Sequence, residues 1–357
     1  MIIDHFGVLG TDKVPVNWQR LLGGVVIFIA HLKRVLPVSV SVKATTTRFE
    51  LKQLFHLMLP ILITQFAAAG FGLIDTIMAG HMSAEDLAAI AVGVGLWIPV
   101  MLLFSGIMIA TTPLVAEANG ARTPEKIPSI STQPLSKFEK MDSVLIKRIL
   151  KLGLPIGLAI FFEVSIFSTG AIVLSPLGEI TVAAHQIALS VTSQLFMIPM
   201  SLALALTIRT GTYFGEKNWF AMRKVQKVGL MTSTLFACTT MLLLLLLRPE
   251  IVSVYTRDYD VSQAAIYLIL FAIGYQLMDA WQVSAAGCLR GMQDTKGPMW
   301  ITMLAYWIIA FPIGIYLARY TDMGAAGVWT GLIIGLTVAC VLLLMRLYNN
   351  NKRLAQN

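Results

Sequence analysis

Residues 152–175, LGLPIGLAIFFEVSIFSTGAIVLS, contain one charged side chain in 24 positions. A transmembrane α-helix needs about 20 consecutive, predominantly apolar residues, so this stretch predicts a membrane-spanning helix. The whole chain has the same character, because 57% of its 357 residues are hydrophobic and 13% are charged. Ordinary soluble domains contain roughly 25% charged residues. The composition therefore predicts an all-α integral membrane protein and excludes a soluble enzyme.

Other apolar segments of similar length follow one another along the chain. Including 152–175, they predict about eight transmembrane helices, at approximately 54–79, 88–118, 152–175, 181–212, 228–247, 263–287, 299–318 and 324–347.

The basic residues between these segments predict the orientation of the chain. When the connections are assigned alternately to the cytoplasmic and the outer side of the membrane, 24 of the 27 Lys and Arg lie on the cytoplasmic side. Those on the outer side are Arg248, Arg257 and Arg319. The positive-inside rule then predicts that both termini are cytoplasmic, in the cell inner membrane. The formal net charge of +8 does not indicate nucleic-acid binding, since the basic residues do not gather on one face.

An internal repeat covers part of the chain. At a constant offset of 95 residues, Pro60 aligns with Pro155 and Gly120 with Gly215, with no gap over about 60 positions. Both copies start on the predicted cytoplasmic side, so the repeat is parallel, an arrangement found in secondary transporters. Four more spans follow the second copy, whereas only a polar linker follows the first.

Two acids lie deep in the predicted spans. Glu163 is about 16 Å along its helix, near the midplane, where a carboxylate costs about 2.5–3.5 kcal/mol. The apolar segments offer almost no basic residue to pair with it, which favours a functional role. Asp279 is similarly deep, and Tyr275 precedes it by four residues on the same helical face. These oxygen atoms suit Na⁺ or a proton; the alternative is an internal hydrogen bond that fixes packing.

Asp75 lies nearer a helix end, so position alone does not separate function from contact with interfacial water. His185, near the start of its span, is interpreted as a packing or interfacial residue. Uncharged polar groups within the spans are expected mainly to join helices by hydrogen bonds: Gln65, Gln186, Gln194, Gln276 and Gln282.

The cysteines and the motif search give no indication of an enzyme. Cys238, Cys288 and Cys340 have neither CxxC nor Cys/His spacing, and are interpreted as small core residues. Catalytic patterns such as HExxH, GxSxG and a phosphate loop do not occur in the sequence. We therefore expect neither an enzyme activity nor a cofactor.

Several motifs, in order, resemble the multidrug and toxic compound extrusion (MATE) family, especially its NorM-like branch. They are FGLIDTIMAG, AAHQIALS, FFEVS, YQLMDAWQ and CLRGMQDTKGP, and the similarity covers about 51–122 and 137–350. The resemblance implies two six-helix lobes that export organic cations in exchange for Na⁺ or H⁺. It implies that Glu163, Tyr275 and Asp279 form a cation site able to hold Na⁺, and that Asp75 is a protonatable aspartate.

Further expectations concern the substrate cavity and the organisation of the chain. Candidates for lining a substrate cavity are Gln65, Gln186, Gln276 and Gln282. The chain lacks counterparts of helices 3 to 6, which matches the incomplete repeat. The expected organisation is a leader (1–50), a two-helix remnant of the N-terminal lobe (51–120), a cytoplasmic linker (121–147), an intact six-helix C-terminal lobe (148–350) and a cytoplasmic tail (351–357).

These features predict a secondary active multidrug transporter that works by alternating access. Its expected partners are lipophilic cations and the lipid bilayer, with Na⁺ or H⁺ as coupling ion. Two alternatives stay open because of the missing helices: an internally deleted remnant that transports nothing, and a membrane scaffold or partner subunit. The sequence indicates neither the substrate nor the oligomeric state.

Overall fold

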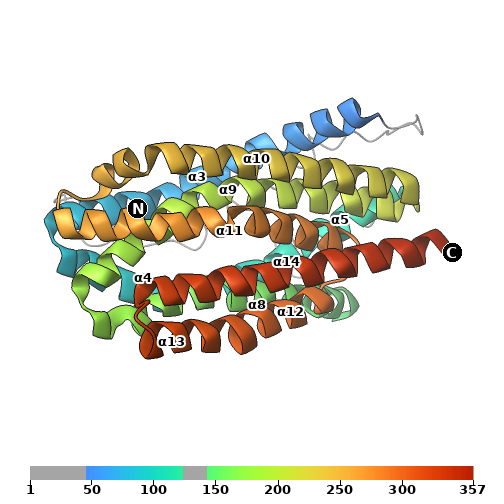
Figure 1. Ribbon diagram of the computed structural model, residues 1–357. Helices are drawn as coiled ribbons and strands as arrows, with labels where there is room; N and C mark the ends of the chain where they lie inside the picture. The colour runs from blue at the N-terminus through green and yellow to red at the C-terminus, as the bar shows by residue number, and fades with distance from the viewer. Residues whose placement is uncertain (1–45, 124–142, 357) are drawn as a thin grey trace, which may run out of the picture. The chain divides into compact units, whose positions relative to one another are not determined.

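The computed structural model describes residues 46–123 and 143–356, and this part of the chain is helical, without strands. Its helices belong to one compact unit and run lengthwise beside one another (Figure 1). They are α3 (Thr47–Met82), α4 (Ala84–Ile109), α5 (Thr111–Gly120), α8 (Ser143–Leu174), η1 (Ser175–Leu177), α9 (Glu179–Gly215), α10 (Trp219–Tyr255), α11 (Tyr259–Gly291), α12 (Lys296–Thr302), η2 (Met303–Ala310), α13 (Phe311–Tyr320) and α14 (Ala325–Gln356).

The predicted all-α membrane fold is confirmed. Within the described residues, eight helical runs are long and apolar enough to cross a membrane. They extend beyond the predicted apolar segments because polar residues at their ends still form helix and cap it. Asn218 accepts a hydrogen bond from the amide of Ala221 at the start of α10, and Asp258 accepts one from Val261 at the start of α11.

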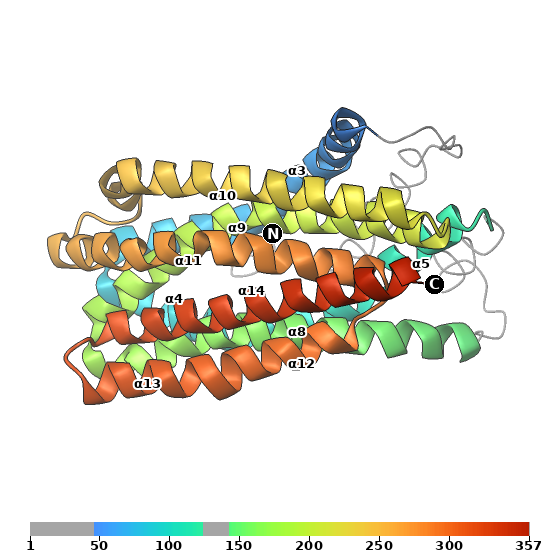
Figure 2. The same ribbon diagram turned by 45° about the vertical axis from the view of Figure 1, so that its right-hand side comes forward.

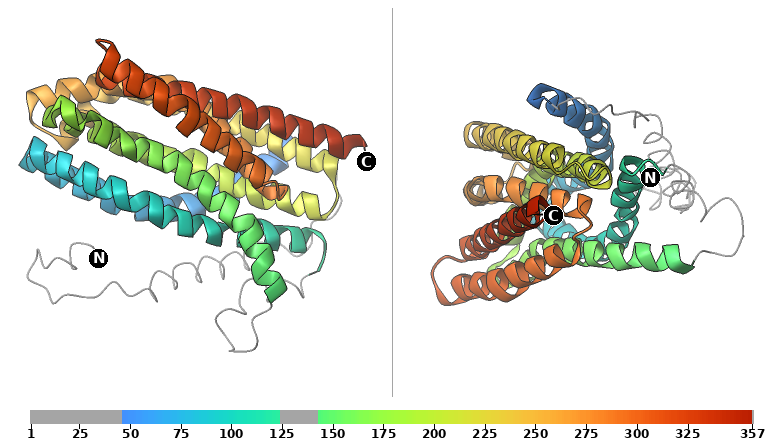
Figure 3. Two further views of the ribbon diagram at one scale, coloured as in Figure 1. Left: turned by 90° about the horizontal axis from the view of Figure 1, so that it is seen from below. Right: turned by 90° about the vertical axis from the view of Figure 1, so that its right-hand side faces the viewer.

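Helix α9 lies at the centre of the packing and contacts α3, α4, α5, α10 and α11. The turned view in Figure 2 shows α9 between α10 and α11. Seen along the helices, α10, α11, α14 and α13 follow one another around one side (Figure 3, right). Buried side chains of α9, α10, α11 and α14 form the main apolar cluster, which includes Ile187, Leu244, Ile269, Trp329 and Leu336.

The two copies of the sequence repeat contact each other through equivalent glycines. A Cβ on Gly120 of α5 would lie 1.9 Å from the carbonyl oxygen of Thr212 in α9. A Cβ on Gly215 would lie 2.2 Å from the carbonyl oxygen of Glu117. Glu117 and Thr212 are also separated by 95 positions. Each glycine of the repeat therefore contacts the residue equivalent to the one that the other glycine contacts. Small residues allow this close backbone approach between helices.

The same backbone conformation follows the ends of α5, α9 and α11. Arg122, Lys217 and Gln293 have positive φ angles of 56°, 56° and 60°. In each case the next amide bonds back across the last turn, for example from Asn218 to the carbonyl of Tyr213. This is the hydrogen-bond pattern of a Schellman cap, and its recurrence at Arg122 and Lys217 extends the repeat beyond the helices.

Replacing Gly120 or Gly215 with valine is expected to destabilise the protein by about 1–3 kcal/mol, because the added atoms meet backbone that cannot move aside. The free energy of unfolding can be measured by SDS titration in mixed micelles. Gly72→Val is the matched control, since nothing lies within 4 Å of its Cβ position. Equal stability of Gly120→Val and the control would contradict the close contact.

Some predictions lie partly or wholly outside the described residues. The leader (1–50) and the linker (121–147) are described only at their edges, and the division of the chain into five segments stays a prediction. The prediction for the cysteines is corrected in part: Cys288 and Cys340 are buried, but Cys238 is exposed. Its position is on the outward face of α10, where a small apolar side chain needs no protein partner.

Candidate functional site

A chain of hydrogen bonds connects Glu163 of α8 to two other helices. One carboxylate oxygen of Glu163 accepts a hydrogen bond of 2.8 Å from Nε2 of Gln282 in α11. The amide oxygen of Gln282 accepts one from the hydroxyl of Tyr306 in η2. Gln282 is almost fully buried, at 1% exposure. These bonds fix which way the Gln282 amide points and hold the Glu163 carboxylate in place.

The π-helical turn η2 brings Tyr306 to this chain. Wide turns of this kind occur frequently at functional sites, and η2 also contacts α8 directly, since Trp307 donates a hydrogen bond of 3.3 Å to the carbonyl of Phe162. Tyr306 was not predicted as a site residue. The only indication in the sequence was a tyrosine within an apolar segment, because a buried tyrosine hydroxyl usually finds a partner.

Asp279 lies one turn before Gln282 on α11 and is 7% exposed. Its carboxyl group interacts electrostatically with the carboxyl group of Glu163 and with the hydroxyl of Tyr306. The structure therefore brings together the two deep acids, which are separated by more than 100 positions in the sequence.

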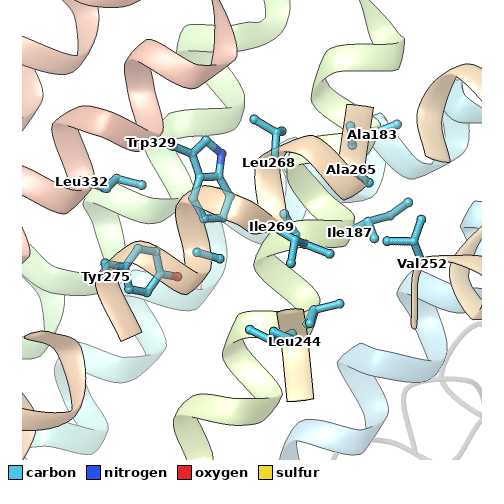
Figure 4. Close-up of a cluster of buried hydrophobic side chains, with 14 of the residues drawn as sticks. Ala183, Ile187, Leu244, Val252, Ala265, Leu268, Ile269, Tyr275, Trp329 and Leu332 are labelled. Carbon is cyan, nitrogen blue, oxygen red and sulfur yellow. The ribbon is translucent and has the colours of Figure 1, made fainter. Parts of the chain in front are cut away.

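Tyr275 precedes Asp279 by four residues on α11 and contacts aromatic rings. Its ring stacks on that of Trp329, with centroids 6.0 Å apart and planes inclined by 15° (Figure 4). Its hydroxyl interacts electrostatically with Asp279. Trp329 in turn donates a hydrogen bond of 3.1 Å to Nδ1 of His185, which is fully buried. The packing interpretation of His185 is thus confirmed, and Tyr275 is held by ring contacts.

Asp75 is not brought to this group. It is half-buried on α3 and makes neither a hydrogen bond nor an ion pair within residues 46–123 and 143–356. Gln65 and Gln186 likewise have no side-chain hydrogen bond in this part of the chain. A role for these three residues stays a prediction.

Two other glutamines join helices, as expected. Gln194 donates to the carbonyl of Ala69, at 3.1 Å, and Gln276 donates to the hydroxyl of Thr240, at 3.3 Å. A cavity of about 300 Å³ lies between α12 and α14, and a smaller one lies among α8, η2, α13 and α14. The substrate cavity at the glutamines stays a prediction.

The expectation that no basic residue lies near Glu163 is wrong. Helix α11 continues to Gly291, so Arg290 is part of the helix rather than of a connection. Arg290 is 6% exposed and interacts electrostatically with Glu163. A second basic residue, Arg209, lies near the end of the predicted segment 181–212; it is also buried and forms an ion pair with Glu50.

The donor atoms fit a hard monovalent cation or a proton. Glu163 and Asp279 supply carboxylates, and Tyr306 supplies a hydroxyl oxygen that interacts electrostatically with both. Among the described residues, no cluster of three or more His, Cys, Asp or Glu side chains is present. Transition metals prefer nitrogen and sulfur donors, whereas the donors of Glu163, Asp279 and Tyr306 are all oxygen atoms.

A family model described as MatE matches residues 60–135 and 155–316, which together make up more than half of the chain. This chain belongs to the MATE family. A probable multidrug resistance protein NorM from Acinetobacter baylyi is 53% identical over 445 residues, covering 88% of this chain and 99% of the relative. Another from Shewanella oneidensis is 32% identical over 435 residues, covering 84% and 95%.

The fold agrees with that of a solved MATE protein. The eukaryotic MATE transporter AtDTX14 superposes with a TM-score of 0.74 at 15% identity, covering 87% of this chain and 98% of that one. The chain is thus a multi-pass membrane protein of the MATE multidrug efflux family, whose members are ion-coupled transporters of small organic cations rather than enzymes.

Proposed function

We propose that this MATE protein is a secondary active transporter that exchanges Na⁺ or H⁺ for lipophilic organic cations by alternating access. The observation that carries the proposal is the pair of acids formed by Glu163, half-buried on α8 and hydrogen-bonded to Gln282, and Asp279, buried on α11. Ionisable residues at membrane depth are expensive and mark ion or substrate pathways. The proposed location is the cell inner membrane, with both termini cytoplasmic.

Competition for the acid pair supplies the coupling. Each cation that neutralises the carboxylates lowers the affinity of the pair for another, so coupling ion and substrate exclude each other. A conformational change follows only if each ligand binds one state better than the other. The hydrogen bonds from Gln282 and Tyr306 connect the acid pair to three helices, and they offer a route by which ion binding shifts helix packing.

The missing helices are part of this proposal. The match to the Acinetobacter baylyi relative extends over 445 residues, which is more than the 357 residues of this chain. This difference supports the prediction that segments of the relative have no counterpart here. In the most apolar stretch of α3, 18% is buried inside the protein, and the value for the α4–α5 run is 19%. The corresponding value for α9 is 56%. Their open surface favours, as second candidate, a remnant or scaffold that docks on another membrane protein.

Ethidium efflux from cells without their own exporters separates the two candidates. Cells expressing this chain are expected to extrude the dye faster than cells expressing the Glu163→Gln/Asp279→Asn double variant, and the Acinetobacter baylyi relative serves as positive control. Efflux is compared under a Na⁺ gradient and under a proton gradient to identify the coupling ion. If only the relative exports the dye, the inactive remnant or scaffold is the better account.

A further inference from the structure

Arg290 is a buried cation on α11, the helix that also carries Asp279, and it lies within electrostatic range of Glu163. Its Nε and Nη2 atoms are inaccessible and have no hydrogen-bond partner among the described residues. The guanidinium interacts electrostatically with Glu163, yet no ion pair within 4.0 Å joins them in the described part of the chain. A buried charge is costly unless it is paired, so the position of Arg290 is not explained by local bonding.

A role at the end of α11 explains Arg290 less well. Basic residues in the last turn of a helix stabilise the negative end of its dipole, and Arg290 lies in the last turn. However, a side chain in that role can extend into water, as the long stem of arginine allows. The side chain of Arg290 instead lies inside the protein and within electrostatic range of Glu163.

Arg290 changes the charge of the cation site. When both are ionised, Glu163 and Asp279 carry two negative charges, and the guanidinium of Arg290 carries one positive charge. The three groups together therefore have one net negative charge. A monovalent cation neutralises this cluster, whereas a divalent cation leaves one positive charge buried, which is unfavourable.

We propose that Arg290 determines charge selectivity, so that the site takes lipophilic cations with one positive charge in preference to those with two. This inference depends on the proposed function, because it concerns the same site. Arg290 acts on the substrate through the field at the acid pair, since each positive charge of the ligand is repelled by the guanidinium. Removing Arg290 favours a divalent ligand more strongly than a monovalent one.

The test measures binding by the purified full chain in detergent, which does not require transport. The probes are ethidium and propidium, which share a phenanthridinium ring system and carry one and two positive charges. Arg290→Gln is expected to raise the affinity ratio of propidium to ethidium by at least about tenfold, the size of one charge–charge interaction in a partly desolvated site. Arg290→Met carries the same prediction if the glutamine variant does not fold.

Three controls separate charge from structure. Arg290→Lys retains the charge and is expected to keep the wild-type ratio. Glu163→Gln/Arg290→Gln restores one net negative charge and is expected to return the ratio towards wild type. Arg257→Gln removes a positive charge from the exposed α10–α11 connection and leaves the ratio unchanged.

The outcomes distinguish the inference from the proposed function. An unchanged ratio in both neutral variants, with both dyes still bound, overturns the role of Arg290 and leaves the transporter proposal standing. A wild-type chain that binds neither dye contradicts the proposed function, and the inference fails with it.

Discussion

Glu163→Gln is expected to lower cation-driven efflux by at least about tenfold while leaving the helix packing unchanged. Glutamine has the shape of glutamate, and its amide oxygen can accept the same hydrogen bond from Gln282. What the change removes is the charge that a coupling ion or substrate must neutralise. Losing one charge from a desolvated charged contact costs about 2–5 kcal/mol, and 1.4 kcal/mol corresponds to about tenfold. Initial rates of ethidium efflux, normalised to protein in the membrane, provide the measurement.

Asp279→Asn is expected to cause a loss of the same order, since Asp279 contributes the second charge of the acid pair. Glu179→Gln is the matched control: it neutralises an exposed acid in the first turn of α9 and should leave the efflux rate unchanged. Wild-type efflux by either Glu163→Gln or Asp279→Asn would show that exchange does not depend on that carboxylate.

The fold could be predicted from the sequence because lipid imposes one simple requirement. A backbone in the bilayer must satisfy its own hydrogen bonds, so a long apolar run such as 152–175 becomes a helix whatever its neighbours are. The ends of the helices were predicted less well. Water and polar side chains compete there for the backbone, so the predicted segment 263–287 ends before Arg290, although α11 continues to Gly291.

The site was predicted in part for the same reason. Carboxylates at membrane depth stand out in an apolar segment, and both Glu163 and Asp279 were identified. Tyr306 and Arg290 were missed because their importance depends on which helices face each other, and on the π-helical turn η2. A single sequence contains no direct measure of either feature. Gln282 was noticed, but its role as the link between Glu163 and Tyr306 required the packed structure.

Arg209→Ala is expected to reduce the free energy of unfolding by about 3–5 kcal/mol, the usual cost of removing one partner from a buried ion pair. Nη2 of Arg209 lies 2.9 Å from Oε2 of Glu50, and the two side chains are 7% and 0% exposed. The hydroxyl of Tyr213 bonds to both. Without Arg209, the Glu50 carboxylate would remain buried at the start of α3 with no cation beside it. SDS titration in mixed micelles measures the loss.

A second ion pair provides the control for this prediction. Arg148 of α8 lies 2.9 Å from Glu117 of α5, but its side chain is 52% exposed. Arg148→Ala should therefore cost no more than about 1 kcal/mol. Combining Glu50→Gln with Arg209→Met should recover much of the stability lost in Arg209→Ala, because the buried charge is then absent rather than unpaired. If Arg209→Ala costs no more than Arg148→Ala, the Glu50 carboxylate has access to water, and the contact between α3 and α9 is looser than this packing requires.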